Sequence, residues 1–197
     1  MRKLVYYVGV SLDGYIAGPG GEFDFYFDCG PADRSAEPMD DMMAWITAEY
    51  PDTVPTHLRA QIGLDAPNRR FDTVLMGRGT YQVDTAVTSP YRHLKQYVVS
   101  TTIPGIDEPG VELVSGDPLA LVRRLKKEGG MDIWLCGGGR LAGSLLPEID
   151  ELIVKSYPVV AGAGLPMVAG EFDPTHFVPT RSRSFGNGAT VTWFTRR

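Results

Sequence analysis

Five short apolar runs rich in β-branched residues recur along the chain, and each is followed by glycine, serine or proline. They span residues 3–10, 73–76, 96–99, 133–136 and 152–157. Runs of this length between turn residues are typical of buried strands. Helical patterns lie between them, so the order of elements predicts an α/β fold with three layers around a mostly parallel sheet.

The clearest helical pattern places Leu119, Val122 and Leu125 on one face. Asp117 precedes this pattern as a candidate N-cap, and Pro118 would occupy the first helical position. The glycines at 129 and 130 then end the pattern. We therefore predict a helix over this segment, packed on the sheet.

The end of the chain has a different pattern. Residues 178–185 and 189–195 flank Asn187-Gly188, a dipeptide that favours a two-residue type I′ turn. An antiparallel hairpin is therefore expected at the edge of the sheet.

The chain carries no internal repeat and no Ser- or Pro-rich linker, so residues 1–197 are predicted to form one domain. Its least regular stretch is residues 18–72, which holds six prolines around one predicted helix near residues 39–49. Because binding residues concentrate on loops that a rigid sheet supports, we expect this stretch to lie over the active site.

The formal net charge of −5, without a basic tail, argues against a nucleic-acid partner. The two cysteines are isolated, and the three histidines have no spacing that suggests a metal site. No run of 18 apolar residues occurs, so no membrane span is expected. These features favour a cytoplasmic protein that binds a small molecule.

Three of the predicted strands end in residues suited to phosphate binding. They are followed by Gly137-Gly138-Gly139, by Gly77-Arg78-Gly79-Thr80 and by Ser100-Thr101-Thr102. Glycines expose backbone N–H groups, arginine offers a forked cation, and the hydroxyls can donate hydrogen bonds. Because ligands bind at the carboxyl ends of parallel strands, we expect these turns on one edge, where they would suit an extended ligand such as NADPH.

Two of the three turns also have a plainer explanation. The glycines after residue 136 can serve close strand–helix packing alone, and the three hydroxyl residues can be ordinary turn residues. A standard Rossmann fold is disfavoured, because its glycine motif lies in the first βα turn rather than at residue 137. The conjunction of the three turns is more specific than any one of them.

Four motifs together resemble the dihydrofolate reductase-like superfamily, in particular the reductase domain of riboflavin biosynthesis. They are VSLDGYIA at 10–17, LMGRGTY at 75–81, VVST at 98–101 and CGGGRL at 136–141. The motifs occur in the family's order and cover nearly the whole chain. The resemblance implies a dihydrofolate reductase-like fold and an NADPH-dependent reductase, and it implies a homodimer.

The resemblance also implies roles for residues of this chain. The adenosine-side phosphates of NADPH would be held by Gly77, Arg78, Thr80, Ser100 and Thr101. The pyrophosphate and nicotinamide side would be contacted by Gly137, Gly138, Gly139, Arg140 and Leu141. Ile16 and the glycines that follow it resemble a loop that covers the nicotinamide.

The nearest activity that the resemblance implies is 5-amino-6-(5-phosphoribosylamino)uracil reductase, which reduces an intermediate of riboflavin biosynthesis. A dihydrofolate or pterin reductase and a non-catalytic nucleotide-binding module are the alternatives. Folate reductases carry a carboxylate on the helix near residues 39–49, where alignment on Trp45 places Met42, and an arginine where this chain has Leu94. Folate is therefore the less favoured substrate.

Two acidic residues are candidates for catalysis. Asp13 can contact substrate or order a water, and it can equally form an Asx turn into Gly14. Asp41 can act as a general acid if burial raises its pKa, or it can stabilise the first turn of a helix. Trp45 and Tyr81 are candidate walls of the substrate pocket, with plain core positions as the alternative.

Overall fold

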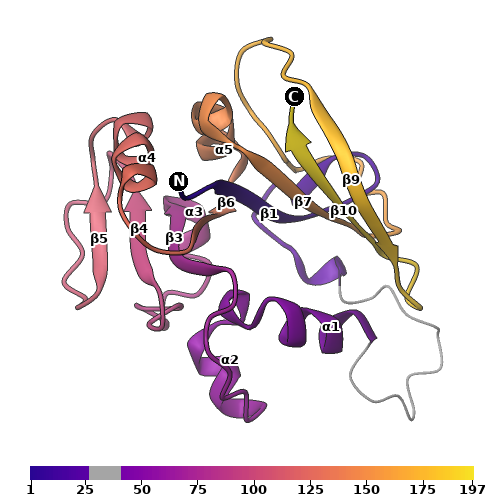
Figure 1. The fold of residues 1–197 in the computed structure, drawn as a ribbon, viewed down its shortest axis with the longest axis horizontal. Helices are drawn as coiled ribbons and strands as arrows, with labels where there is room; N and C mark the ends of the chain where they lie inside the picture. The colour runs from indigo at the N-terminus through magenta and orange to yellow at the C-terminus, as the bar shows by residue number, and fades with distance from the viewer. Residues whose placement is uncertain (27–40) are drawn as a thin grey trace.

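An eight-stranded sheet crosses the molecule in the computed structural model, which describes residues 1–26 and 41–197 (Figure 1). Its order is β5-β4-β3-β6-β1-β7-β10-β9. The strands are β1 (Leu4–Val10), β3 (Phe71–Gly77), β4 (Lys95–Val99), β5 (Val111–Val114), β6 (Asp132–Gly137), β7 (Glu151–Ser156), β9 (Phe177–Ser184) and β10 (Thr190–Arg196). The predicted strands and the mostly parallel sheet are confirmed.

All pairings from β5 to β7 are parallel, and only β10 and β9 run antiparallel to their neighbours. Sequence patterns missed β5 because it is short and lies at the edge with no fully buried residue. They also missed a two-stranded antiparallel sheet of β2 (Tyr15–Ala17) and β8 (Leu165–Pro166).

Helices cover both faces of the large sheet, which confirms the three layers (Figure 1). One face packs on α4 (Pro118–Lys127) and α5 (Gly139–Leu145), and the other packs on α1 (Asp41–Glu49). Further turns of helix are α2 (Thr56–Gln61), α3 (Arg78–Tyr81), η1 (Asp24–Tyr26), η2 (Pro51–Thr53) and η3 (Leu146–Glu148). In the described part of the chain, no helix has the length and apolar character that crossing a membrane requires.

Alternation along β1 assigns its side chains to two cores. Leu4, Tyr6 and Val8 face the layer of α4 and α5, whereas Val5 and Tyr7 face α1. This period of two is the geometry of a strand that is buried on both faces. The α1 face is the aromatic one, with Tyr7, Trp45 and Trp134 in one cluster.

The N-terminus of α4 forms as its sequence indicates. Asp117 accepts a hydrogen bond from the Leu119 N–H at 2.9 Å, and Pro118 is the first helical residue. This contact satisfies one of the N–H groups that have no partner inside the helix.

The C-terminal hairpin is confirmed, but its predicted turn type is wrong. The Phe185 N–H donates to the Ala189 carbonyl, which closes a loop of three residues, 186–188, rather than two. A type I′ turn needs positive φ at both Asn187 and Gly188, and only Gly188 has it, at +82°. The asparagine therefore stays in an ordinary conformation, and glycine alone takes the left-handed one.

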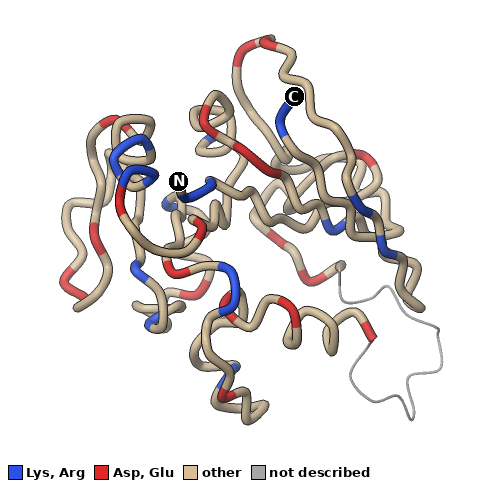
Figure 2. Tube along the Cα trace, in the orientation of Figure 1, with Lys and Arg blue, Asp and Glu red and all other residues tan. Residues whose placement is uncertain are grey.

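Oppositely charged side chains pair at the amino ends of the parallel strands, and basic and acidic segments lie near one another around the N-terminus in Figure 2. Arg70 lies within 3.3 Å of Asp132 and also pairs with Glu151, which in turn binds the Lys3 ammonium at 2.5 Å. These pairs join β1, β6 and β7 to the segment before β3. They are partly exposed, so each is expected to add little to stability by itself.

A buried carboxylate fixes the start of β3. Asp52 is fully buried and accepts hydrogen bonds from the backbone N–H groups of Arg69, Arg70 and Phe71 at 2.7, 3.2 and 2.8 Å. A carboxylate in this place satisfies donors that would otherwise be buried without a partner. It thereby ties η2 to the strand whose other end carries Gly77.

We expect Asp52→Asn to lower the free energy of unfolding by about 2 kcal/mol, because the amide places a donor where buried N–H groups need an acceptor. The measurement is chemical denaturation monitored by tryptophan fluorescence. Asp173→Asn, at an exposed position, is the matched control and should change stability by less than about 0.5 kcal/mol. Equal effects of the two substitutions would contradict this account of Asp52.

Candidate functional site

The carboxyl ends of β4, β3 and β6 meet at one edge of the sheet, because these strands are parallel neighbours. The three turns that sequence analysis singled out therefore lie side by side. A Cβ placed on Gly77 would lie 3.5 Å from the Gly138 N, and one placed on Gly137 would lie 3.5 Å from Thr80 Oγ1. This edge is the candidate functional site.

The three glycines after β6 serve different purposes. Gly137 has a φ of +141° and is joined to Gly138 by a cis peptide. A Cβ on Gly139 would lie 2.1 Å from the Pro166 carbonyl oxygen, so close packing against the end of β8 requires glycine there. Gly138 has no such restriction, since its nearest side-chain neighbour is Ile16, 3.8 Å from a Cβ position. The packing explanation thus applies to Gly139 but not to Gly138.

Two helices begin at this edge without a side-chain cap. Gly77 is the N-cap of α3 and Gly138 is the N-cap of α5, and neither offers a side chain to the first N–H groups. Such N–H groups have no partner inside their own helix. Arg140 is exposed on the first turn of α5, whereas Leu141 is buried in the core on the other side. Leu141 nevertheless lies beside the Gly77 turn, since a Cβ on Gly77 would be 3.9 Å from the Leu141 Cβ.

The turn after β4 joins the turn after β3 through a hydrogen bond. The Arg78 Nη1 donates to Thr102 Oγ1 at 2.9 Å, and both side chains are exposed. Ser100 is buried, and its hydroxyl accepts from the N–H groups of Thr102 and Ile103 at 3.2 Å. Ser100 therefore shapes the turn, whereas Arg78 and the exposed Thr101 are accessible to a ligand.

Asp13 links two loops. Its carboxylate accepts hydrogen bonds from the Ser11 hydroxyl at 2.6 Å and from the N–H groups of Ala161 and Gly162 at 3.0 and 2.7 Å. The Ser11 hydrogen bond, followed by the backbone ones, lowers the pKa of Asp13 to about 2. A group that is ionised at neutral pH and already bound by three donors is poorly suited to donate a proton. Asp13 thus joins two loops, whereas the N–H of Gly14, the residue into which the Asx turn is expected to lead, donates to the Ser11 carbonyl.

The other tentative residues also have contacts of their own. Asp41 begins α1, and its carboxylate accepts a hydrogen bond from the Gly186 N–H at 3.1 Å, in the turn of the C-terminal hairpin.

Trp45, a candidate wall of the substrate pocket, is buried, with its ring 5.2 Å from the Phe185 ring and 5.7 Å from the Trp193 ring. The expected pocket wall at Trp45 is therefore corrected to a core position, because α1 packs this face directly on the hairpin. Tyr81 is partly buried and donates to the Thr88 carbonyl at 2.8 Å.

Sequence analysis missed a polar group on the sheet. Lys155 lies in β7, and its Nζ is 4.1 Å from the centre of the Tyr7 ring. Cys136 on β6 interacts with it electrostatically, and burial raises the pKa of that thiol to about 12. The only available signal was a lysine in the middle of an apolar strand, since residues 152–157 read Leu-Ile-Val-Lys-Ser-Tyr.

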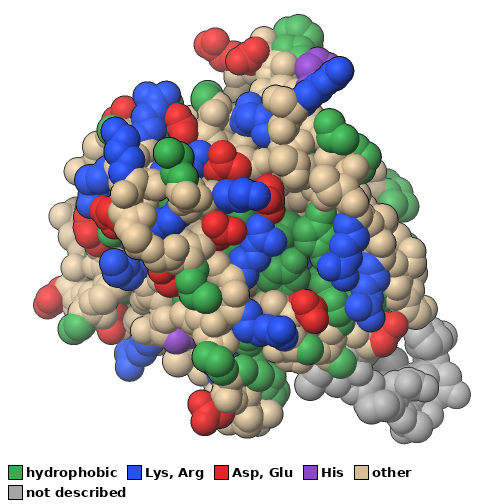
Figure 3. Space-filling view, viewed as in Figure 1, with side chains coloured by type: hydrophobic (Ala, Val, Ile, Leu, Met, Phe, Trp, Pro, Cys, Tyr) green, Lys and Arg blue, Asp and Glu red, His purple; other side chains and the backbone are tan. Residues whose placement is uncertain are grey.

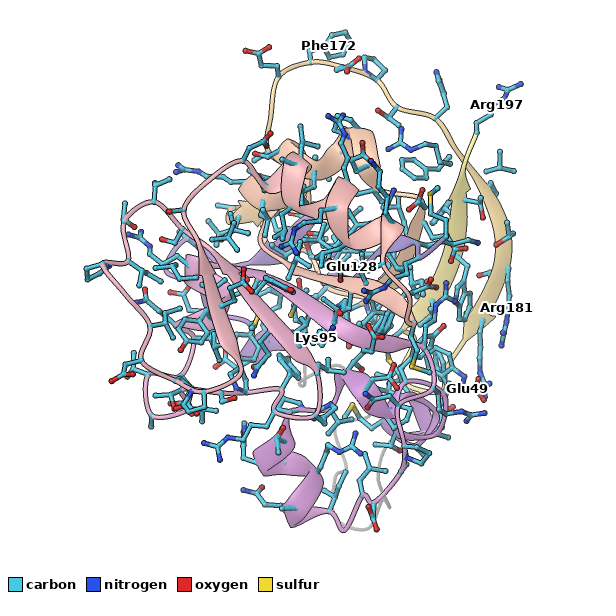
Figure 4. The ribbon with its side chains drawn as sticks, turned by 60° about the vertical axis from the view of Figure 1, so that its left-hand side comes forward. Glu49, Lys95, Glu128, Phe172, Arg181 and Arg197 are labelled. Atoms are coloured by element: carbon cyan, nitrogen blue, oxygen red, sulfur yellow. The ribbon has the colours of Figure 1, made fainter. Side chains whose placement is uncertain are left out.

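A cavity of about 420 Å³ lies at the opposite, amino-terminal end of the strands. Glu49 and Arg181 face it from α1 and β9 (Figure 4), and an apolar surface flanked by basic side chains is visible beside β9 (Figure 3). It is lined also by Arg70, which is paired with Glu151. This cavity does not reach the glycine turns, so it is separate from the candidate site. Within residues 1–26 and 41–197, no group of three metal-ligating side chains gathers.

The sheet order and the position of the turns define a dihydrofolate reductase-like α/β protein. The family model of the RibD C-terminal domain matches residues 2–191, and the chain belongs to this family. Two curated relatives are from Bacillus subtilis (strain 168): the uncharacterized proteins YwjB, 31% identical, and YyaP, 26% identical. The matches cover 96% of both this chain and YwjB, and 95% of this chain with 91% of YyaP.

Two solved structures have the same fold. One is a putative riboflavin biosynthesis protein from Shewanella sp. PV-4, with a TM-score of 0.69, 22% identity and coverage of 100% of this chain and 99% of that one. The other is a diaminohydroxyphosphoribosylaminopyrimidine deaminase/5-amino-6-(5-phosphoribosylamino)uracil reductase from Thermotoga maritima, with a TM-score of 0.64 and 13% identity. The match covers 100% of this chain but 57% of that protein, so this chain spans little more than half of it.

We expect Asp13→Ala to speed hydrogen exchange at the N–H groups of Ala161 and Gly162, since both lose their acceptor. The Leu119 N–H, which Asp117 caps, serves as the internal control and should be unaffected. The pKa of Asp13 in the folded state lies below the ordinary value of 3.8. Its contribution to the stability of the fold is therefore complete above about pH 4 and is lost as the pH falls towards 2. If NMR spectra showed that the carboxyl group of Asp13 titrates near its ordinary pKa of 3.8, the result would contradict these hydrogen bonds.

Proposed function

We propose that this chain is an NADPH-dependent reductase of a small heterocyclic substrate, nearest in type to 5-amino-6-(5-phosphoribosylamino)uracil reductase. The observation that carries the proposal is the meeting of three strand ends at one edge, with two uncapped helix starts beside an exposed arginine. Membership of the RibD C-terminal domain family adds the reductase class.

The residues at the edge fit a dinucleotide phosphate. Arg78 and Thr101 would hold the 2′-phosphate of NADPH, and the backbone from Gly137 to Gly139 would approach the pyrophosphate. Space is available beside α3, because a Cβ on Gly79 would meet no other atom within 4 Å. Thr80 and Ile16 converge on Gly138 and would border the nicotinamide side. When bound, NADPH supplies the reducing equivalent.

The layer over the sheet favours a substrate other than folate. On α1 the side chain buried toward the sheet is Met42, whereas Asp41 contacts the hairpin turn. The carboxylate by which folate reductases bind their substrate thus has no counterpart on the described part of this helix. We infer that residues 18–72 border the substrate; residues 27–40 of that segment lie outside the described part of the chain.

We propose further that residues 1–197 act as one domain, that the protein is cytoplasmic, and that it works as a homodimer. The two cysteines, isolated in the sequence, support a reducing compartment. The dimer follows the family resemblance, and β9 offers an edge of the sheet with one neighbour.

We expect Arg78→Ala to weaken NADPH binding about tenfold and NADH binding much less, because only NADPH carries the 2′-phosphate that a charge-assisted hydrogen bond would recognise. Calorimetric titration with each nucleotide measures this difference. Arg123→Ala on α4, whose side chain pairs with Glu148, is the matched control and should leave both affinities unchanged. Equal losses for the two nucleotides would refute the 2′-phosphate assignment, and NADPH binding without turnover of any pyrimidine would favour a non-catalytic module.

Sedimentation equilibrium tests the quaternary proposal. The chain has a mass of 21.6 kDa, so a homodimer should sediment at twice that mass. A single species at the monomer mass across the concentrations used in assays would overturn it.

A further inference from the structure

Lys155 occupies an unusual place on the sheet. It pairs with Gly9 on β1 and Val191 on β10, one residue before β7 ends. Its ammonium lies against the Tyr7 ring, on the face that α1 covers. Cys136, with which it interacts, directly precedes the Gly137 turn. Lys155 therefore belongs to the same carboxyl edge as the proposed cofactor site, two strands away.

Solvent reaches this part of the sheet. Gly9, Cys136 and Lys155 are partly exposed, although Tyr7 and Ile153 between them are buried. Gly9 allows the Tyr157 ring to pack closely over β1, because a Cβ there would lie 3.2 Å from that ring. Three adjacent strands, β6, β1 and β7, thus each carry one partly exposed residue at the end of the aromatic face, and Lys155 is the cation among them.

The lysine has no anionic partner within the described residues. The titratable groups that share this face are the phenols of Tyr7 and Tyr26 and the thiol of Cys136, whose pKa values burial raises, so all three are neutral at pH 7. Tyr157 packs beside Tyr26 in the same cluster. Arg183 of β9 is a cation on this face; it pairs in register with Val191 and lies over the Trp45 ring. Burial lowers the pKa of Lys155 to about 8. An uncompensated charge is unfavourable for folding, which argues for a functional reason to retain it.

We propose that Lys155 binds and protonates the reducible C=N or C=O group of the substrate. This assignment rests on the proposed reductase function and adds the proton donor to it. The carbon of the double bond receives the hydride equivalent that NADPH supplies, and the heteroatom keeps the π electrons and takes a proton from the Lys155 ammonium. The resulting neutral amine regains its proton from water.

The same geometry limits the substrate class. An ammonium has three N–H donors and no acceptor, so it selects a ring edge that presents carbonyl oxygens or unprotonated nitrogens. The ammonium repels a diaminopyrimidine ring that carries a positive charge, because such a ring presents N–H donors rather than acceptors. Lys155 therefore favours uracil-like rings over the rings that a carboxylate recognises.

The first test separates function from packing. Lys155→Met removes the charge at similar length, and Lys95→Met, at an exposed lysine of β4 (Figure 4), is the matched control. Because the pKa of Lys155 in the folded state is lowered from 10.5, Lys155→Met should unfold at a higher temperature than wild type at pH 7. The difference should shrink as the pH rises from about 8 towards 10.5. A lower unfolding temperature in Lys155→Met would show that the lysine stabilises the fold, against the proposal.

The second test measures binding of 1,3-dimethyluracil, whose carbonyls accept hydrogen bonds and which does not titrate, by tryptophan fluorescence. Wild type should bind it about tenfold more tightly at about pH 6.5 than at about pH 9.5, as one charge-assisted hydrogen bond is lost. Lys155→Met should bind weakly at both, and Lys155→Arg should restore binding at both. No binding by wild type, or a pH dependence that survives in Lys155→Met, would overturn the assignment.

NADPH affinity is measured on the same samples. Wild type and Lys155→Met should bind NADPH equally, and the rate of pyrimidine reduction by wild type should fall as the pH rises through about 8. Failure of wild type to bind NADPH would refute the reductase function itself. Normal NADPH binding and an unchanged turnover number in Lys155→Met would refute only the role of Lys155.

Discussion

Parallel pairing of β3 with both β4 and β6 is the constraint on which the candidate site depends. Parallel strands place their carboxyl ends on one edge, so turns that are 20 to 60 residues apart in the chain become neighbours. Asp52 secures the other end of β3 by accepting three backbone N–H groups in the buried interior. The site therefore draws its rigidity from hydrogen bonds made far from any ligand.

The segment after β7 folds back over the glycine turns and holds them. Close contact of α5 with this segment requires glycine at two positions, since a Cβ on Gly139 would meet Pro166 and one on Gly143 would lie 1.9 Å from the Ala169 carbonyl oxygen. The same segment begins with Ala161 and Gly162, which Asp13 binds. Asp13, which the sequence offered as a catalytic candidate, thus helps to position the loops around the site.

The two faces of the sheet have different characters. The face under α4 and α5 is aliphatic and holds the helices on the sheet. The face under α1 is aromatic and carries the partly exposed Lys155 near its carboxyl end. Neutral thiol and phenol groups surround this lysine, so its ammonium can interact strongly with an acceptor that enters from solvent.

Local patterns in the sequence determined the elements and their order. Apolar β-branched runs specified five of the eight strands of the large sheet, the segments that flank Asn187-Gly188 specified β9 and β10, and Asp117-Pro118 specified the start of α4. Parallel topology follows from alternating strands and helices, which is why the shared edge of the three turns could also be predicted. The type of the hairpin turn could not, because Asn187 fits either loop and the pairing of β9 with β10 chose the three-residue one.

Individual roles at the site depend on contacts between distant segments, which only the tertiary structure decided. Gly138 and Gly139 are equivalent in the sequence, and the approach of Pro166 separates them. Trp45 became a core residue because α1 packs on the hairpin. Lys155 gained a candidate role only when β1 and β6 placed Gly9 and Cys136 beside it. Short-range periodicity determines where strands and helices form, whereas the environment of a side chain depends on residues that lie 19 to 148 positions away in these examples.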